Sequence, residues 1–215
     1  MEFANLSRRS LLAGTLACSA GSASATRLDG DAWTRLGAGN ARFAAGRPTH
    51  PRQDPAWRRQ LVDGQQPFAC VLGCADSRVP VELLFDQGLG DLFTVRAVGQ
   101  VLDDAVVGSI EYAIGHLGVR TVVVLGHSGC GAVRAAIELV GGTGEVAGSV
   151  STVARAIEAT VRATPPGPDF LSACVRNQVR RIAAELPRRS GMIDTAGPEI
   201  IPAVYDLGSG LVRRH

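Results

Sequence analysis

Two short apolar runs constrain the fold of this chain more than any other feature of its sequence. Residues 68–73 and 121–126 contain no charged side chain and are rich in aliphatic residues, and residues 92–95 form a weaker third run. Short runs that are apolar throughout are typical of parallel strands buried on both faces. Residues 103–117, which precede the run at 121–126, carry apolar side chains at helical spacing. The pattern predicts an α/β, Rossmann-like fold with a mainly parallel central sheet flanked by helices.

Helical spacing of apolar residues also occurs on both sides of this predicted core. Ahead of it, two amphipathic segments at 31–45 and 54–62 predict an N-terminal helical arm, the first capped by Asp31. A C-terminal strand and turn at the sheet edge are expected from residues 200–207, the turn at 208–210 and Leu211-Val212. No repeat and no linker is evident, so residues 26–215 are predicted to form a single domain. Further helices are expected over 130–140, 149–163 and 169–186.

The first 25 residues have the features of a targeting signal rather than of a folded element. Arg8 and Arg9 precede an uncharged run that ends in small residues at Ala25. This order resembles a twin-arginine export signal cleaved after Ala25, and the run is too short and too polar for a transmembrane helix. We expect an exported, periplasmic or extracytoplasmic protein, with Cys18 as a minor candidate for a lipid anchor. The alternative is a frayed N-terminal helix on a cytoplasmic protein.

Composition narrows the class of function. The 22 basic residues, all arginine, face 20 acidic ones, for a formal net charge of +2. No stretch concentrates them as a nucleic-acid surface requires, so nucleic acid is not an expected partner. The absence of lysine from the sequence excludes Schiff-base chemistry, a phosphate-loop lysine and a Ser-Lys nucleophile pair.

A set of metal-binding residue types follows the predicted strands. The runs at 68–73 and 121–126 end in the same Val-Leu-Gly sequence, followed by Cys74 and His127. If both strands are parallel, these side chains emerge at the same carboxyl edge of the sheet, where open α/β sheets bind ligands. Cys130 lies in the turn into the next helix and can reach the same point. Two thiolates and one imidazole suit tetrahedral Zn²⁺, and three protein ligands leave one position open.

Other residues leave alternatives open. Asp76 could fill the fourth position on the metal, or Arg78 could hold it away in a bidentate pair. An even number of cysteines after cleavage would also permit disulfides in an exported protein, but the spacing beside His127 favours metal. Cys70 and Cys174 are better interpreted as core residues.

Two longer motifs resemble those of a known family. Between residues 41 and 136 the chain is similar to the β-class carbonic anhydrases. The resemblance rests on Cys74-Ala75-Asp76-Ser77-Arg78-Val79-Pro80 and His127-Ser128-Gly129-Cys130-Gly131-Ala132, with support from the sequences at 85–91 and 108–112.

The resemblance implies an enzyme that hydrates carbon dioxide reversibly to bicarbonate and a proton, by attack of hydroxide formed at zinc. It implies one Zn²⁺ per chain, held by Cys74, His127 and Cys130, with Asp76 and Arg78 as a catalytic dyad. Asp76 would be a fourth ligand in a resting form. Family members associate, so a homodimer or tetramer is expected, and Trp33, Phe43 and Trp57 are candidates for contacts between arms or within the chain.

The chain departs from the family pattern in two places. It has Val98-Gly99-Gln100 where many members read Ala-Gly-Asn, and Val71 where a subset with an inhibitory bicarbonate pocket has Trp. Gly99 and Gly129 are candidate substrate-pocket residues. Two alternative functions stay open: a carbonyl sulfide or carbon disulfide hydrolase on the same scaffold, and a non-catalytic zinc- or bicarbonate-binding partner of a transporter.

Overall fold

A five-stranded sheet forms the centre of the computed structural model, which describes residues 31–144 and 147–215. The predicted export signal lies outside these residues. The strand order is β2-β1-β3-β4-β5. The first four strands are parallel, and the short β5 runs antiparallel to β4. The strands are β1 (Ala69–Gly73), β2 (Leu92–Arg96), β3 (Thr121–His127), β4 (Glu199–Tyr205) and β5 (Val212–Arg214).

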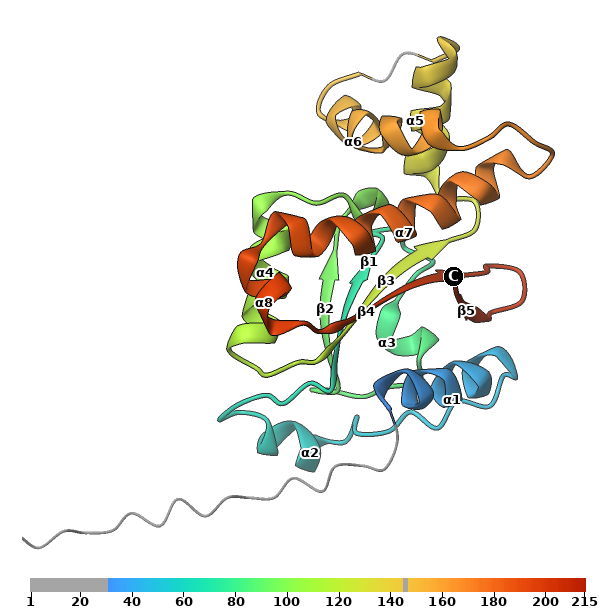
Figure 1. Cartoon of the computed structure of the whole chain (residues 1–215). Helices are drawn as coiled ribbons and strands as arrows, with labels where there is room; N and C mark the ends of the chain where they lie inside the picture. Colours follow the sequence, from blue (N-terminus) through green and yellow to red (C-terminus); the bar gives the residue numbers. More distant parts are fainter. Residues whose placement is uncertain (1–30, 145–146) are drawn as a thin grey trace, which may run out of the picture.

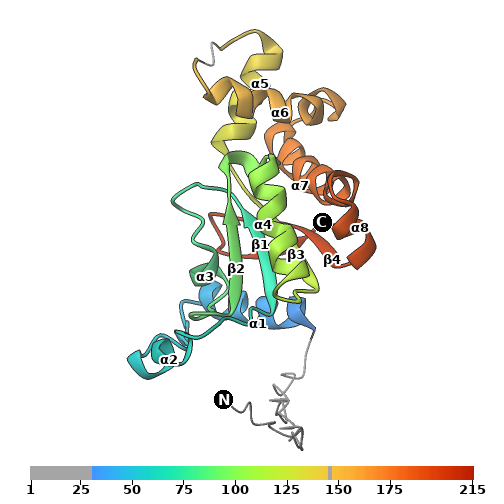
Figure 2. The same ribbon diagram turned by 90° about the vertical axis from the view of Figure 1, so that its left-hand side faces the viewer.

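Helices cover both faces of the sheet, and two of them extend beyond the carboxyl ends of its parallel strands. Figures 1 and 2 show α5 and α6 projecting past the carboxyl ends of β1 and β2, well away from the sheet. None of the helices in the described ranges combines the length and apolarity needed to span a membrane. The helices are α1 (Ala32–Ala44), α2 (Pro55–Gln60), α3 (Val81–Leu84), α4 (Asp104–Gly115), α5 (Gly131–Gly141), α6 (Val150–Ala163), α7 (Phe170–Arg189) and α8 (Gly191–Ala196), with the short 3-10 helix η1 (Val98–Gln100).

Alternation along the strands divides the core into two layers. Cys70 and Leu72 of β1 face α4, α7 and α8, whereas Val71 faces α1 and α3. A third apolar cluster joins α5, α6 and the start of α7 at the carboxyl edge of the sheet. Cys70 and Cys174 are both fully buried, as expected for core residues, and burial raises the pKa of the Cys70 thiol to about 12.

The predicted α/β fold, its parallel core and a C-terminal strand at the edge of the sheet are confirmed. The expected tail divides into two strands around the turn at 208–210: β4 lies inside the sheet, and β5, which pairs with β4 on its outer side, forms the edge. Buried Asn40 of α1 holds this last hairpin in place. Its side-chain amide donates to the carbonyl of Gly210 at 2.9 Å, and its oxygen accepts from the backbone N–H of Val212 at 2.8 Å. The β5 edge therefore depends on a helix 170 residues away in sequence.

The N-terminal arm packs on the chain's own sheet. Asp31 caps α1 by accepting a hydrogen bond from the backbone N–H of Trp33, and the side chain of Leu36 is fully buried. Trp33 and Phe43 pack against the same core layer as Leu36, and the Trp57 indole donates to the carbonyl of Leu89 at 2.9 Å. Of the two alternatives for these three aromatic residues, the described chain contains the contacts within the chain.

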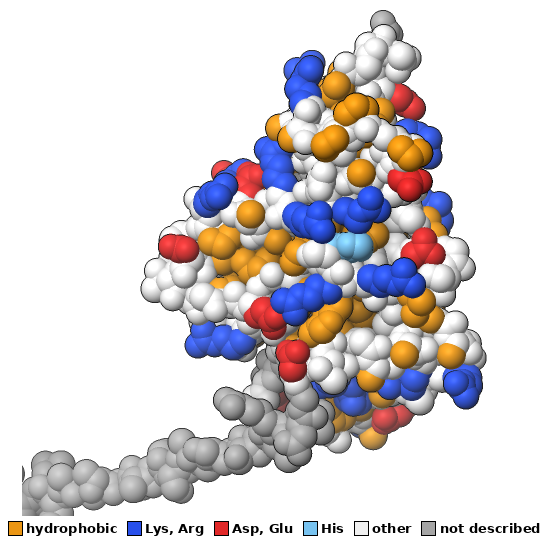
Figure 3. All heavy atoms as spheres, turned by 45° about the vertical axis from the view of Figure 1, so that its right-hand side comes forward, with side chains coloured by type: hydrophobic (Ala, Val, Ile, Leu, Met, Phe, Trp, Pro, Cys, Tyr) orange, Lys and Arg blue, Asp and Glu red, His pale blue; other side chains and the backbone are white. Residues whose placement is uncertain are grey.

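Arginines gather on one face of the molecule. Figure 3 shows blue arginine side chains around a histidine. Burial lowers the pKa of His215, and the neighbouring positive charges of Arg176, Arg180 and Arg213 lower it further. Within the described ranges these three arginines form no ion pair with a carboxylate. This face, made by α7 and the C-terminal strand, therefore carries local positive charge.

Candidate metal centre

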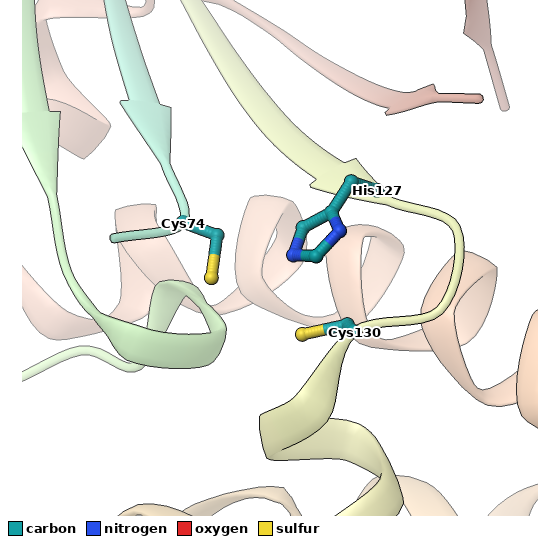
Figure 4. A group of neighbouring side chains, drawn as sticks. All are labelled: Cys74, His127 and Cys130. Carbon is teal, nitrogen blue, oxygen red and sulfur yellow. The ribbon is translucent and has the colours of Figure 1, made fainter. Parts of the chain in front are cut away.

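Three potential metal ligands meet at the carboxyl edge of the sheet. Cys74 directly follows β1, His127 is the last residue of β3, and Cys130 is the N-cap residue of α5. Their ligand atoms all lie within 4.8 Å of one another, and Figure 4 shows the three side chains pointing toward a common centre. All three residues are buried, His127 completely. The structure thus brings together the three residues that the strand pattern placed at this edge.

The imidazole of His127 has one nitrogen engaged and one available. Nδ1 lies 3.1 Å from the carbonyl oxygen of Ser128, which can only accept, so Nδ1 carries the proton. Nε2 is buried and has no hydrogen-bond partner among the described residues. A buried nitrogen without a partner is costly unless a ligand satisfies it. This tautomer, fixed by a carbonyl behind the ring, is the arrangement of a metal-bound histidine.

Backbone amides stabilise negative charge on both sulfurs. The N–H of Gly99 donates to the Cys74 sulfur at 3.4 Å, and the N–H of Asp76 also points to it. The sulfur of Cys130 accepts from the N–H groups of Ala132 and Val133 in the first turn of α5. Amides at a helix N-terminus favour a thiolate.

The two sulfurs also influence each other's ionisation. A hydrogen bond with Cys130 lowers the pKa of Cys74, and the same bond, together with burial, raises the pKa of Cys130. Two sulfurs in such contact can both ionise only if a cation sits between them. The donor set, the bare Nε2 and the amide support therefore fit a divalent metal of the zinc type.

Asp76 and Arg78 form a bidentate pair beside this cluster. Arg78 donates from Nε to Oδ1 of Asp76 at 2.9 Å and from Nη2 to Oδ2 at 2.7 Å, and its backbone N–H donates to Oδ1 as well. These bonds hold the pKa of Asp76 well below its usual range. Oδ2 lies 3.7 Å from Nε2 of His127. Of the two positions that the sequence left open for Asp76, the structure contains the one on Arg78.

The two candidate pocket glycines occupy different surroundings. Gly99 is buried with φ of +65°, and a Cβ there would lie 2.7 Å from Cδ1 of Ile157 and 2.9 Å from Cβ of Ala132. Its main contact with the site is the N–H bond to Cys74. Gly129 has φ of +66°, and a Cβ there would meet no described atom within 4 Å. Both positions demand the left-handed backbone region, and their role toward substrate stays a prediction.

Sequence reasoning missed Arg96. This last residue of β2 donates from Nε to the carbonyl of Cys74 at 2.9 Å and from Nη2 to the carbonyl of Asp76 at 2.7 Å. The rule that placed Cys74 and His127 at the carboxyl edge applies equally to the end of β2. The available signal was a charged residue, Arg96, directly after the apolar run at 92–95.

Comparison with known proteins agrees with this geometry. Residues 69–212 match the family model described as "Carbonic anhydrase". A carbonic anhydrase of Mycolicibacterium smegmatis is 44% identical over 187 residues, which cover 84% of this chain and 90% of that protein. Carbonic anhydrase 2 of Mycobacterium tuberculosis is 58% identical over 106 residues, 49% of this chain. That match spans only about half (51%) of the length of the M. tuberculosis protein.

Solved structures share the fold. A tetrameric β-carbonic anhydrase from Sordaria macrospora superposes with a TM-score of 0.67 at 24% identity, covering 85% of this chain and 95% of that one. The β-carbonic anhydrase CafA of Aspergillus fumigatus superposes with a TM-score of 0.66 at 25% identity, covering 86% and 91%. With the family match over two thirds of its length, the chain belongs to the carbonic anhydrase family and has the β-class fold.

Proposed function

We propose that this chain is a zinc enzyme that interconverts carbon dioxide and bicarbonate. Membership of the carbonic anhydrase family supports the reaction. The observation that carries the proposal for zinc is the convergence of two sulfurs and a partnerless imidazole nitrogen within 4.8 Å. Cys74, His127 and Cys130 would hold the ion, and three protein ligands leave a tetrahedral position for solvent.

The residues beside the cluster supply orientation. Zinc, when bound, lowers the pKa of water so that hydroxide is available near neutral pH. Asp76 is ionised and can only accept hydrogen bonds, so it directs the attacking oxygen by accepting its hydrogen. Arg78 holds both carboxylate oxygens, which fixes the direction of that acceptor. The attacking oxygen would form a new C–O bond to the carbon of carbon dioxide, which gives bicarbonate. The proton lost when the water ionised would pass to solvent.

Asp76 also has a second position in this proposal. If its carboxylate leaves Arg78, it can become the fourth ligand of the metal and exclude solvent. The separation of 3.7 Å between Oδ2 and Nε2 of His127 supports this, because the carboxylate already lies beside one of the proposed ligand atoms. Only one of the two positions permits hydration, so the Asp76–Arg78 bond would separate an active form from a resting form.

A stopped-flow assay of carbon dioxide hydration on the zinc-loaded full chain tests the function. We expect hydration together with about one zinc per chain, and loss of both in Cys74→Ser. Cys70→Ala is the control, because Cys70 is also buried, four residues earlier in β1, but faces the core, and this variant should keep its zinc. Zinc binding without hydration would contradict the enzyme. Hydrolysis of carbonyl sulfide or carbon disulfide in preference to hydration would favour the alternative substrates.

We also propose that the chain assembles as a dimer or tetramer and is exported. The tetrameric relatives from S. macrospora share its fold, which supports assembly, and light scattering on a sizing column measures it directly. Export rests on Arg8, Arg9 and the apolar run after them. Replacing both arginines with lysine should keep the protein in the cytoplasm, and unchanged export would contradict a twin-arginine route.

A further inference from the structure

Arg96 connects two neighbouring strands at the edge where the ligands gather. It ends β2, directly opposite Gly73 at the end of β1 in the parallel register. From there its guanidinium reaches the turn after β1 and donates to two carbonyl oxygens, those of Cys74 and Asp76, at 2.9 and 2.7 Å. A planar guanidinium can bind two acceptors at once in a fixed geometry. One side chain thus spans the turn from the first ligand to the carboxylate residue.

The start of this turn is also tied to the segment after β2, because the N–H of Ala75 donates to the carbonyl of Ala97 at 3.3 Å and the N–H of Gly99 donates to the sulfur of Cys74 at 3.4 Å. From Asp76 onward the other bonds of the turn are local. The carboxylate of Asp76 is held by Arg78, two residues away, and its carbonyl also accepts from the N–H of Val79 at 3.0 Å. These local bonds fix the internal shape of the part of the turn that carries Asp76, but they do not fix the place of that part relative to the sheet. Among side chains of the described residues, Arg96 is the one that donates to the carbonyls of Cys74 and Asp76.

We propose that Arg96 is a positioning residue for the reaction. Its two bonds hold the turn so that the carboxylate of Asp76 stays on Arg78 and beside the three ligand atoms. This inference rests on the proposed function and adds a residue to it. Without Arg96, both carbonyls lose a charged donor, and the part of the turn that carries Asp76 can shift relative to β2. The carboxylate is then free to exchange Arg78 for the metal, which favours the resting form.

The variant Arg96→Met tests the proposal, because methionine keeps an apolar stem and removes both donors. We expect kcat to fall about 10- to 100-fold, the scale of a misplaced catalytic group, with KM nearly unchanged and zinc still one per chain. Arg96→Lys should be intermediate, because a single ammonium cannot reproduce the fork. Arg120→Met is the matched control. Arg120 also donates to a backbone carbonyl, that of Ala196, but at the opposite edge of the sheet.

A second readout follows the carboxylate itself. Cobalt(II) in place of zinc has visible absorption that reports its ligand set and geometry. Arg96→Met should change this spectrum in the presence of Asp76 and leave it unchanged when Asp76→Asn is already present. Wild-type kcat and spectrum in Arg96→Met would overturn the proposal. So would a spectrum that changes equally without the carboxylate, since that indicates a general loosening of the site.

Failure of this inference is distinguishable from failure of the proposed function. A wild-type chain that binds metal but does not hydrate carbon dioxide contradicts the function, whereas the cobalt comparison still decides whether Arg96 positions Asp76. If Arg96→Met does not fold, Arg96→Lys carries the same comparison. An Arg96→Lys protein with normal kcat and a normal spectrum would then overturn the positioning role.

Discussion

Two regions of the described chain hold aspartates on arginines through hydrogen bonds of 2.9 Å or less, and these aspartates differ in how firmly they are held. Beside the ligand cluster, Asp76 is bound by Arg78 only two residues away, and the side chains are 18% and 55% exposed. At the base of the N-terminal arm, Asp86 and Asp91 are 1% and 8% exposed. The arginines that bind these two lie 39 to 56 residues away; we call these five residues the arm clamp: Arg35, Arg42, Arg52, Asp86 and Asp91.

The arm clamp saturates its carboxylates. Asp86 accepts hydrogen bonds from the backbone N–H groups of Thr49 and His50, the Thr49 hydroxyl and Arg42. These donors come from distant segments, so moving Asp86 would break several contacts together. Asp76 gains its side-chain bonds from one partner that is itself in solvent. The difference indicates that the same chemistry fixes structure in one region and leaves a carboxylate exchangeable in the other.

Arg78→Ala should produce the largest effect on activity. The variant frees Asp76 to bind the metal and removes the orientation of the attacking oxygen, so we expect kcat to fall about 100- to 1,000-fold. Zinc should remain near one per chain, because the three ligands are intact. Stopped-flow hydration with a metal assay on the same sample measures both. Retained activity would contradict the exchange between Arg78 and metal.

The same variant should scarcely affect folding. The Asp76–Arg78 pair is local and Arg78 lies largely in solvent, so its loss should leave the free energy of unfolding almost unchanged. Urea unfolding of the wild type and the variant measures this. A much larger loss would mean that the pair is structural, and the contrast with the arm clamp would disappear.

Asp86→Asn should show the reverse pattern. The amide NH₂ would face the donors of Thr49, His50 and Arg42, leaving buried groups unpaired. We expect a loss of about 3 kcal/mol in the free energy of unfolding, with kcat of the folded protein within about twofold of wild type. Urea unfolding and hydration assays on one preparation test both halves. A large fall in kcat at unchanged stability would contradict a purely structural clamp.

The lowered pKa of Asp86 predicts how the free energy of unfolding depends on pH. Burial alone would raise the pKa of Asp86, but hydrogen bonds from Thr49, Arg42 and His50 outweigh it and lower the pKa to about 2. Because the pKa is lower in the folded than in the unfolded chain, this stabilisation is complete above about pH 5 and is lost as the pH falls toward 2. It amounts to about 2 kcal/mol. The difference in unfolding free energy between wild type and Asp86→Asn should therefore shrink on acidification, and a constant difference would contradict the assignment.

The sequence predicted the parts of this contrast that depend on local pattern. Apolar runs predict three of the strands, and the rule for the carboxyl ends of parallel strands predicts that Cys74 and His127 lie together. Both signals lie within a few residues of the feature that they predict. The Asp76–Arg78 pair, two residues apart, was for the same reason one of two stated alternatives.

Features that depend on distant segments were not predictable in this way. Arg42 and Asp86 are 44 residues apart, and neither carries a local mark of its partner. The edge strand β5 is three residues long and contains Arg213 and Arg214, so its pairing with β4 has no apolar pattern to reveal it. The short helices α3 and α8 are likewise too brief to show a period. Tertiary contacts, rather than local preference, determine these elements.

Glu158→Gln should have the smallest effect on stability and activity, and it serves as the reference for comparing the Asp76–Arg78 pair with the arm clamp. Glu158 pairs with Arg162 one turn later on α6 at 2.6 Å, and the side chains are 33% and 61% exposed, much like Asp76 and Arg78. An exposed pair at this spacing contributes about 0.3–0.5 kcal/mol, so Glu158→Gln should change the free energy of unfolding by no more than that and leave kcat unchanged. Urea unfolding and the hydration assay on this variant measure how much an exposed ion pair outside the site contributes to stability and to kcat. If it lost as much stability as Asp86→Asn, exposure would not separate movable from structural carboxylates, and the exchange proposed for Asp76 would need support from the cobalt spectra alone.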